Sequence, residues 1–207
     1  MIESRNYRLR PIEISDRDFV IETMLDFPVT TMTYASAMNE FSNMEYVSRG
    51  FREEDVMTHT EVTMILEHAG VPVGLRVSRF TEGVVEIAIV ARHPSHRGAD
   101  HGKADNFLHG WWYFEALNCT SCWFETIDDV SVNSLVSKWR EKAVTEEWTR
   151  PSRFDKENTL RSGTILPDEY RELKAESPEW KQEITEQTAP IRRGSGVSIN
   201  KPNPASS

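Results

Sequence analysis

One continuous stretch, residues 84–117, constrains the fold of this chain more than any other part of the sequence. Residues 84–91 are mostly apolar and β-branched, and a polar loop that contains Gly98 and Gly102 follows them. Helical spacing of apolar and aromatic residues then begins at Lys103. A strand, a glycine-containing turn and a helix start, in this order, direct backbone N–H groups toward an anion. The stretch therefore predicts a site for a phosphate-bearing ligand.

Composition limits the classes of protein that this chain can belong to. A length of 207 residues fits one domain with extensions, and the net charge of -9 disfavours a nonspecific grip on nucleic acid. The sequence contains no apolar run of about 18–20 residues and no apolar signal-peptide core at its start. Cys119 and Cys122 are too few for a disulfide framework. We expect an acidic, soluble and cytoplasmic protein with neither a membrane nor a nucleic acid as partner.

Periodicity predicts alternating strands and helices along most of the chain. The expected strands are 7–12, 63–68, 71–80, 84–91 and 122–127, with one or two closing strands within 145–166. The expected helices are one from Ser15-Asp16 to about residue 25, 103–117, 132–143 and a charged helix over 167–182. Residues 28–43 are interpreted as loop or irregular helix, and 44–57 carry mixed helical signals.

The order of these elements predicts an α+β (mixed α/β) fold, with a central mixed, twisted sheet flanked by helices. The strands 84–91 and 122–127 should be parallel, because a helix connects them as a crossover. We place the domain at 1–166, a charged helical extension at 167–182, and a flexible polar tail at 183–207.

The sequence resembles the GCN5-related N-acetyltransferase (GNAT) superfamily from about residue 7 to 142. Three segments carry this resemblance: Tyr7-Arg8-Leu9-Arg10-Pro11, the loop with His93, Pro94, Arg97, Gly98, Asp100 and Gly102, and Asn133 followed by Glu141-Lys142. The family has a first strand like that opening segment and an Arg/Gln-x-x-Gly-x-Gly/Ala loop after a strand. It also has an Asn on the next strand–helix connection.

The resemblance implies that the protein binds acetyl-CoA as a substrate and needs no metal. The pyrophosphate would lie on the loop residues Arg97, Gly98, Ala99, Asp100, His101 and Gly102, with Asn133 as a further cofactor-binding residue. The pantetheine arm would pair with the main chain of Val90, Ala91 and Arg92. A backbone N–H at that strand end could also polarise the thioester carbonyl.

The resemblance further implies N-acetyl transfer to an amine, on a protein or peptide, by direct attack in a ternary complex. Glu86 matches the position of a general base that acts through water, and apolar neighbours would desolvate its carboxylate. The alternative for Glu86 is a solvent-facing strand residue. His93, His96 and His101 are further candidates for proton transfer.

The sequence departs from the family at three positions, which keeps a second hypothesis open. Asp100 stands where the loop usually has Gly, Arg140 where many members have Tyr, and Val144-Thr145 where Gly-Phe is usual. A carboxylate at Asp100 would oppose a pyrophosphate. The alternative is a catalytically inactive GNAT-fold structural or interaction protein, for example a subunit of a phage particle (virion) or another assembly. Exposed aromatics such as Trp112 or Tyr113 would then serve as interface anchors.

Three other patterns have simpler interpretations. The histidines 93, 96, 101 and 109, with Asp100 and Asp105, match no standard zinc spacing, so we expect no metal site. Cys119 and Cys122 form a C-x-x-C pair between a helix end and a strand start, which favours buried thiols over a redox motif. Helix 103–117 is apolar on nearly every side, which favours burial between layers.

Overall fold

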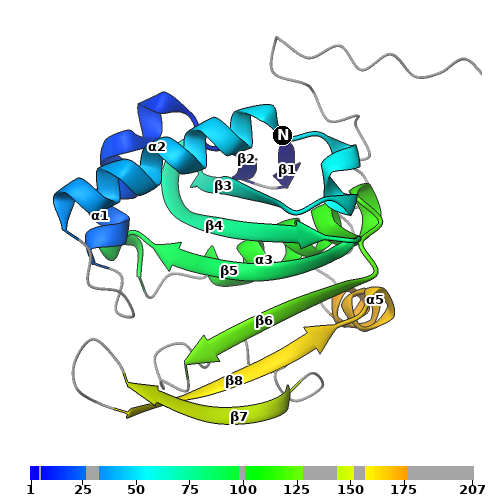
Figure 1. Cartoon of the computed structure of the whole chain (residues 1–207). Coiled ribbons are helices and arrows are strands. Elements are labelled where there is room, and N and C mark those ends of the chain that lie inside the picture. Colours follow the sequence, from blue (N-terminus) through cyan, green and yellow to red (C-terminus); the bar gives the residue numbers. More distant parts are fainter. Residues whose placement is uncertain (5, 27–32, 98–100, 128–143, 152–156, 177–207) are drawn as a thin grey trace, which may run out of the picture.

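The computed structural model describes residues 1–4, 6–26, 33–97, 101–127, 144–151 and 157–176. Its centre is an eight-stranded sheet in the order β1-β2-β3-β4-β5-β6-β8-β7. The pair β5–β6 is parallel, as the sequence predicts, and the other neighbouring strands are antiparallel (Figure 1). The predicted α+β class with a mixed sheet is therefore confirmed.

The bounds of the elements follow the chain in two halves. The first half contains β1 (Ile2–Ser4), β2 (Tyr7–Pro11), η1 (Ile14–Asp16), α1 (Arg17–Leu25), α2 (Tyr34–Gly50), η2 (Glu53–Met57), β3 (Thr60–His68) and β4 (Val71–Thr81). The second half contains β5 (Val84–Arg92), η3 (Pro94–His96), α3 (His101–Trp111), η4 (Trp112–Ala116), β6 (Ser121–Ile127), β7 (Val144–Pro151), β8 (Glu157–Ile165) and α5 (Pro167–Ala175).

Two tight hairpins set the register of the central strands β3, β4 and β5. Both central residues of each turn have positive φ, at 51° and 80° for Ala69-Gly70 and at 52° and 77° for Glu82-Gly83. Turns of this kind match the right-handed twist of the strands that they join. The strands expected at 63–68, 71–80 and 84–91 are confirmed as β3, β4 and β5.

The N-terminal half differs from the expectation in two elements. Much of the segment expected to be loop or irregular helix belongs to the 17-residue helix α2. Thr33 starts this helix, because its hydroxyl accepts a hydrogen bond from the N–H of Ser36 at 3.2 Å. Only Ala37, Phe41, Met44 and Ser48 of the helix are buried, so its apolar stripe is narrow and hard to recognise. The short strand β1 was also not predicted, whereas β7 and β8 confirm the expected closing strands.

Three predicted segments lie wholly or partly outside the described residues. The predicted helix over 132–143 and the predicted tail over 183–207 lie outside the described residues. The charged helix expected over 167–182 is present as α5, which is described as far as Glu176.

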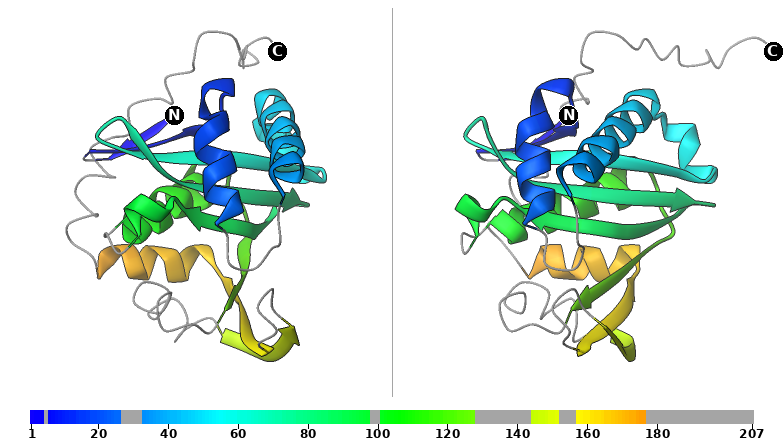
Figure 2. Two further views of the ribbon diagram at one scale, coloured as in Figure 1. Left: turned by 90° about the vertical axis from the view of Figure 1, so that its left-hand side faces the viewer. Right: turned by 60° about the vertical axis from the view of Figure 1, so that its left-hand side comes forward.

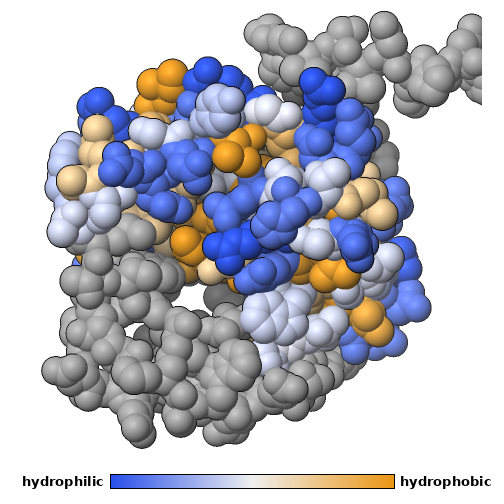
Figure 3. Space-filling model, viewed as in Figure 1, coloured by the Kyte–Doolittle hydropathy of each residue, from blue (hydrophilic) through white to orange (hydrophobic). Residues whose placement is uncertain are grey.

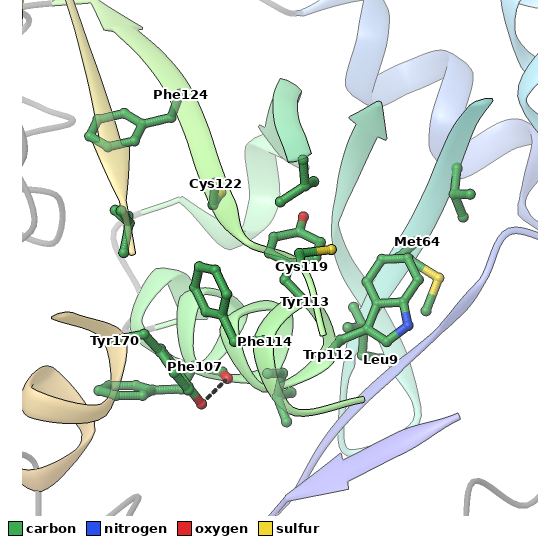
Figure 4. Close-up of a cluster of buried hydrophobic side chains, with 14 of the residues drawn as sticks. Leu9, Met64, Phe107, Trp112, Tyr113, Phe114, Cys119, Cys122, Phe124 and Tyr170 are labelled. Atoms are coloured by element: carbon green, nitrogen blue, oxygen red, sulfur yellow. Dashed lines mark hydrogen bonds between the residues drawn. The ribbon is translucent and has the colours of Figure 1, made fainter. Parts of the chain in front are cut away.

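Helices cover both faces of the sheet, with α1 and α2 on one face and α3 and α5 on the other (Figure 2). The core on the α3 face gathers side chains from the sheet, from α3 and η4, and from α5 (Figure 4). Trp112, Tyr113 and Phe114 lie in it at 5%, 1% and 3% exposure. Burial of the aromatic helix is thus confirmed, and the use of Trp112 or Tyr113 as an outward interface anchor is wrong.

Helix α5 shares this core, although the sequence analysis set it apart as an extension. The Tyr170 hydroxyl donates a hydrogen bond to the carbonyl of Phe107 at 3.2 Å (Figure 4). A Cβ on Gly110 would lie 2.4 Å from the Tyr170 ring, so the absence of a side chain there lets α5 approach α3. Tyr170 and Leu173 are both buried, which ties α5 to the domain.

The outer surface over α1 and α2 is mainly hydrophilic, with separate apolar residues (Figure 3). The exposed aromatic side chains there are Tyr34 and Tyr46 of α2, at 60% and 76% exposure. Among the described residues, none of the helices combines the length and apolar character that a bilayer crossing requires.

Candidate active site

The parallel strands β5 and β6 separate halfway along β5. Their ladder joins Val84–Ile87 to residues 121–124, after which β6 continues beside β8 and β5 continues beside β4 (Figure 1). The separation coincides with a β-bulge: Val77 pairs with Ile89 and Ser78 pairs with Ile87, so Ala88 is the extra residue. A bulge bends a strand and increases its twist. Within the described residues, the edge of β5 from Ala88 onward therefore faces no strand on its β6 side.

The predicted pantetheine-binding residues Val90, Ala91 and Arg92 lie on this open half of β5. Val90 is 41% exposed, Ala91 is buried against the α1–α2 face, and the Arg92 side chain turns toward α3. An unpaired strand edge offers N–H and C=O groups that an amide-containing ligand can satisfy. Within the described residues, this edge is therefore open to an amide-containing ligand.

Helix α3 follows β5 in the chain, and its first residue, His101, packs against Tyr7 of β2 and His68 of β3. Three residues of the predicted phosphate loop are described: Arg97, His101 and Gly102, whereas Gly98, Ala99 and Asp100 lie outside the described residues, as does Asn133. The Arg97 guanidinium forms an ion pair with Asp26 at the end of α1, and both side chains are about half-exposed, at 48% and 47%. His101 is buried at 7% exposure, and its Nδ1 lies 3.0 Å from the Tyr7 hydroxyl.

Four histidine rings form a row beside the start of α3. The ring centroids lie 5.1 Å apart for His68 and His101, 5.9 Å for His101 and His96, and 6.0 Å for His96 and His93. His93 also lies 3.1 Å from Glu22 of α1 through its Nε2. The sequence analysis missed His68, because it belongs to a strand distant in the chain. Within the described ranges, no three His, Cys, Asp or Glu side chains are grouped so that they could hold a metal.

Glu86 lies one residue before the last β5–β6 pair, on the same face of the sheet as α1 and α2. Its Oε1 accepts from Arg79 Nη1 at 3.4 Å, and Arg79 Nε donates to Glu61 at 2.7 Å. The Glu86 side chain is 39% exposed, so its setting is not the desolvated one expected. The reason is that Val85 and Ile87 point to the opposite face of the strand.

A buried ion network lies under α3, and we call it the α3 network: Arg76, Arg92 and Asp105. Asp105 Oδ2 pairs with the guanidinium of Arg76 and lies 3.0 Å from Arg92 Nη2. Arg76 and Asp105 have side chains 2% and 0% exposed, and Arg92 is 16% exposed. Burial would raise the pKa of Asp105, but the two guanidiniums and His109 hold that pKa well below its usual range.

His109 completes the surroundings of this network from the next turn of α3. Its Nδ1 lies 3.0 Å from Asp105 Oδ1, and its Nε2 has no hydrogen-bond partner among the described residues. Burial and the nearby Arg76 lower the pKa of His109, so the imidazole is neutral near pH 7. Sequence reasoning considered Asp105 and His109 only as metal ligands, an interpretation that it rejected, and it missed Arg76. The available signal was an arginine within the apolar strand β4.

The two thiols are buried, as the sequence analysis expected. Cys119 and Cys122 are buried and free, and burial raises the pKa of each thiol to about 12. A thiolate is the reactive form of cysteine, so these values disfavour redox chemistry at neutral pH.

Comparison with known proteins supports the architecture through structure alone. No protein-family model matches the sequence, and no curated protein matches it either. The spermidine N-acetyltransferase SpeG of Vibrio cholerae, solved in complex with CoA and spermine, superposes with a TM-score of 0.59 at 16% identity, covering 80% of this chain and 98% of that one. A probable acetyltransferase of the GNAT family from Chromobacterium violaceum gives a TM-score of 0.60 at 10% identity, covering 82% and 87%.

These superpositions and the separation of β5 from β6 define the fold class. The chain has the fold of the GNAT superfamily, as the motif around residues 84–142 indicates.

Proposed function

We propose that this protein is an acetyl-CoA-dependent N-acetyltransferase that acts on an amine. The observation that carries the proposal is the edge of β5 beyond Ile87, which runs free of β6 and is joined to α3 by the contact of Arg92 with Asp105. An extended pantetheine arm needs such an edge, and a pyrophosphate needs a helix N-terminus. The GNAT fold brings the two together in one place.

The described side chains around this edge suit an anionic, amide-containing ligand. Arg97 lies four residues before the start of α3, and its partner Asp26 is itself half-exposed, so the pair can exchange partners with water or ligand. His96 and His101 add donors beside the same helix end. Gly98, Ala99, Asp100 and Asn133 complete the proposed cofactor-binding set.

Acetyl transfer needs a free amine, a polarised thioester and a route for one proton. The amine nitrogen attacks the carbonyl carbon, the C–S bond breaks, and coenzyme A leaves as a thiol after it takes up the proton that the amine loses. We propose that Glu86 removes this proton through water, and that a backbone N–H of the free β5 edge stabilises the oxyanion. The half-exposed Glu86 carboxylate is open to such a water.

As the acceptor we propose a small cationic amine, in preference to a protein or peptide. The net charge of -9 favours the approach of cations. SpeG, which has the same fold, was solved with spermine. The protein or peptide acceptor that the sequence resemblance implies is the second candidate for the same chemistry, and the assay below separates the two.

The test is a thiol-release assay on the full chain with acetyl-CoA and either spermidine or an amine-bearing peptide. We expect release of CoA with spermidine, and a fall in kcat of about 100-fold in Glu86→Gln, because the carboxylate is the proton acceptor. Glu61→Gln is the matched control: it removes the other carboxylate bound to Arg79, on β3, two strands away from β5, and kcat should change less than about twofold.

Two outcomes would contradict parts of this proposal. Turnover with the peptide alone would reverse the order of acceptors. If acetyl-CoA neither binds nor turns over at millimolar concentration, the scaffold alternative without catalysis is favoured instead.

A further inference from the structure

The two parts of the proposed acetyl-CoA site are joined by a buried carboxylate. Arg92 is the last residue of β5, and Asp105 lies in the second turn of α3. Their contact of 3.0 Å connects the end of the free strand edge to the helix whose start lies beside it. Arg76 of β4 holds the same Oδ2 atom, so the carboxylate joins three elements.

The absence of a side chain at Gly74 leaves space for the Arg92 side chain to reach Asp105. Gly74 pairs directly with Arg92 across β4 and β5. A Cβ on Gly74 would lie 2.7 Å from Arg92 Nη1 and 2.9 Å from the carbonyl of Ala91. The guanidinium therefore lies where any larger residue at Gly74 would exclude it. Arg92 Nη1 also donates to the Ala91 carbonyl at 3.2 Å, which fixes the side chain along its own strand end.

The charges in the α3 network do not balance within the described residues. Two guanidiniums share one carboxylate, and His109 is held neutral by burial and by Arg76. Removing one of the two cations leaves a one-to-one ion pair, which needs no second guanidinium for its stability. The presence of Arg92 in the network thus calls for a reason other than charge compensation of Asp105.

We propose that Asp105 and Arg92 are positioning residues for acetyl-CoA, a role that rests on the proposed function. Their ion pair fixes the distance between the free edge of β5 and the N-terminal turn of α3. Acetyl-CoA must contact the free edge of β5 with its pantetheine arm and the N-terminal turn of α3 with its pyrophosphate at the same time. Small misplacements of either element are costly in such sites. Neither side chain acts on the reacting atoms.

The experiment measures acetyl-CoA affinity by calorimetry in three full-length variants and the unaltered protein. Arg92→Gln keeps the pair of Arg76 with Asp105, so it should fold, and we expect its Kd for acetyl-CoA to rise about tenfold. Asp105→Asn should weaken binding by at least as much. Asp16→Asn is the matched control, because it removes a buried carboxylate of the same kind, bound to Arg10 under α1, and should change Kd less than about twofold.

Kinetic measurements distinguish the positioning role of Arg92 from a purely structural one. In Arg92→Gln we expect the KM for acetyl-CoA to rise about tenfold while the KM for the amine stays within about twofold, because the proposed role of Arg92 concerns acetyl-CoA alone. Arg92→Lys keeps a cation of similar reach and should recover part of the affinity. These readouts do not depend on whether Asp105→Asn folds.

The outcomes separate this inference from the proposed function. Failure of the unaltered protein to bind acetyl-CoA would overturn the proposed function, and the positioning role with it. Binding by the unaltered protein with an equal Kd in Arg92→Gln would overturn the positioning role alone. The same conclusion follows if Asp16→Asn weakens binding as much as Asp105→Asn, because the effect would then be general destabilisation.

Discussion

Two buried ion networks lie on opposite faces of the sheet, and their charges are arranged in opposite ways. Under α1, Arg10 binds Asp16 at 2.6 and 2.7 Å and Glu67 at 2.7 Å, so one guanidinium serves two carboxylates. We call Arg10, Asp16 and Glu67 the α1 network. Under α3, one carboxylate serves Arg76 and Arg92.

Neighbouring donors compensate the surplus negative charge of the α1 network. Glu67 also receives Arg8 Nη1 at 3.4 Å from the rim, and Asp16 accepts the N–H of Glu13 at 2.8 Å. Every contact therefore serves the junction of β2, β3 and the start of α1. The α3 network has no second anion among the described residues, and it ends beside the proposed ligand site. The difference indicates that one network is structural and that the other links structure to binding.

The largest predicted effect on stability comes from Asp105→Asn. This change leaves two buried guanidiniums without an anion, so we expect it to lower the free energy of unfolding by about 3–5 kcal/mol. Asp16→Asn leaves Arg10 paired with Glu67, so its cost should be about 1–3 kcal/mol. Urea unfolding measures both values. Equal costs would show that charge balance does not distinguish the two networks.

Gly74→Ala tests the packing on which the α3 network depends. The added methyl group would press on Arg92 and on the Ala91 carbonyl, and we expect a loss of about 1–3 kcal/mol together with weaker acetyl-CoA binding. Gly50→Ala is the control, because a Cβ there meets nothing within 4 Å. Thermal unfolding with and without acetyl-CoA reads both effects. A stable Gly74→Ala protein with unaltered affinity would separate Arg92 from the ligand site.

His109 makes the stability of the α3 network depend on pH. Its pKa in the folded state lies below the unfolded value of 6.5, so unfolding takes up a proton as the pH falls below that value. Stability should therefore be full above about pH 6.5 and decline toward pH 5, by at most about 1.4 kcal/mol per pH unit.

The contribution of His109 is isolated by a difference between two proteins. In His109→Asn the amide keeps a polar contact to Asp105 but cannot titrate, so the decline should be shallower than in the unaltered protein. Asp16→Asn should keep the full decline. Parallel pH profiles for His109→Asn and the unaltered protein would mean that the pKa of His109 is the same in the folded and unfolded states.

The sequence predicted the parts of the fold that local chemistry determines. Positive φ at Ala69-Gly70 and at Glu82-Gly83 needs particular turn residues, and the apolar run 84–91 needs a buried strand, so these elements could be recognised. Helix α2 was missed because its buried stripe is narrow. The short strand β1 was missed because three residues carry no measurable periodicity.

For the candidate site, sequence reasoning names main-chain positions but not the side-chain partners. The resemblance to GNAT proteins implies Val90, Ala91 and Arg92, which stay a prediction. The ion pairs of Arg92 could not be predicted, because Asp105 and Arg76 come from other elements and only the fold brings them together. The same reason explains the setting of Glu86: the partner Arg79 belongs to the neighbouring strand.

The smallest effect on stability is expected for Arg97→Gln, at the surface between the two networks and the ligand site. Arg97 and Asp26 are both about half-exposed, at 48% and 47%, so water and salt screen their attraction and the loss should stay within about 0.5 kcal/mol. Its effect on acetyl-CoA should be much larger, about tenfold in Kd, because a phosphate would replace Asp26 as the partner of the guanidinium. Asp26→Asn frees Arg97 from its competitor and should leave affinity equal or higher. If both variants bind acetyl-CoA equally well, Arg97 belongs only to the surface of α1, and the pyrophosphate must be held by the backbone at the start of α3.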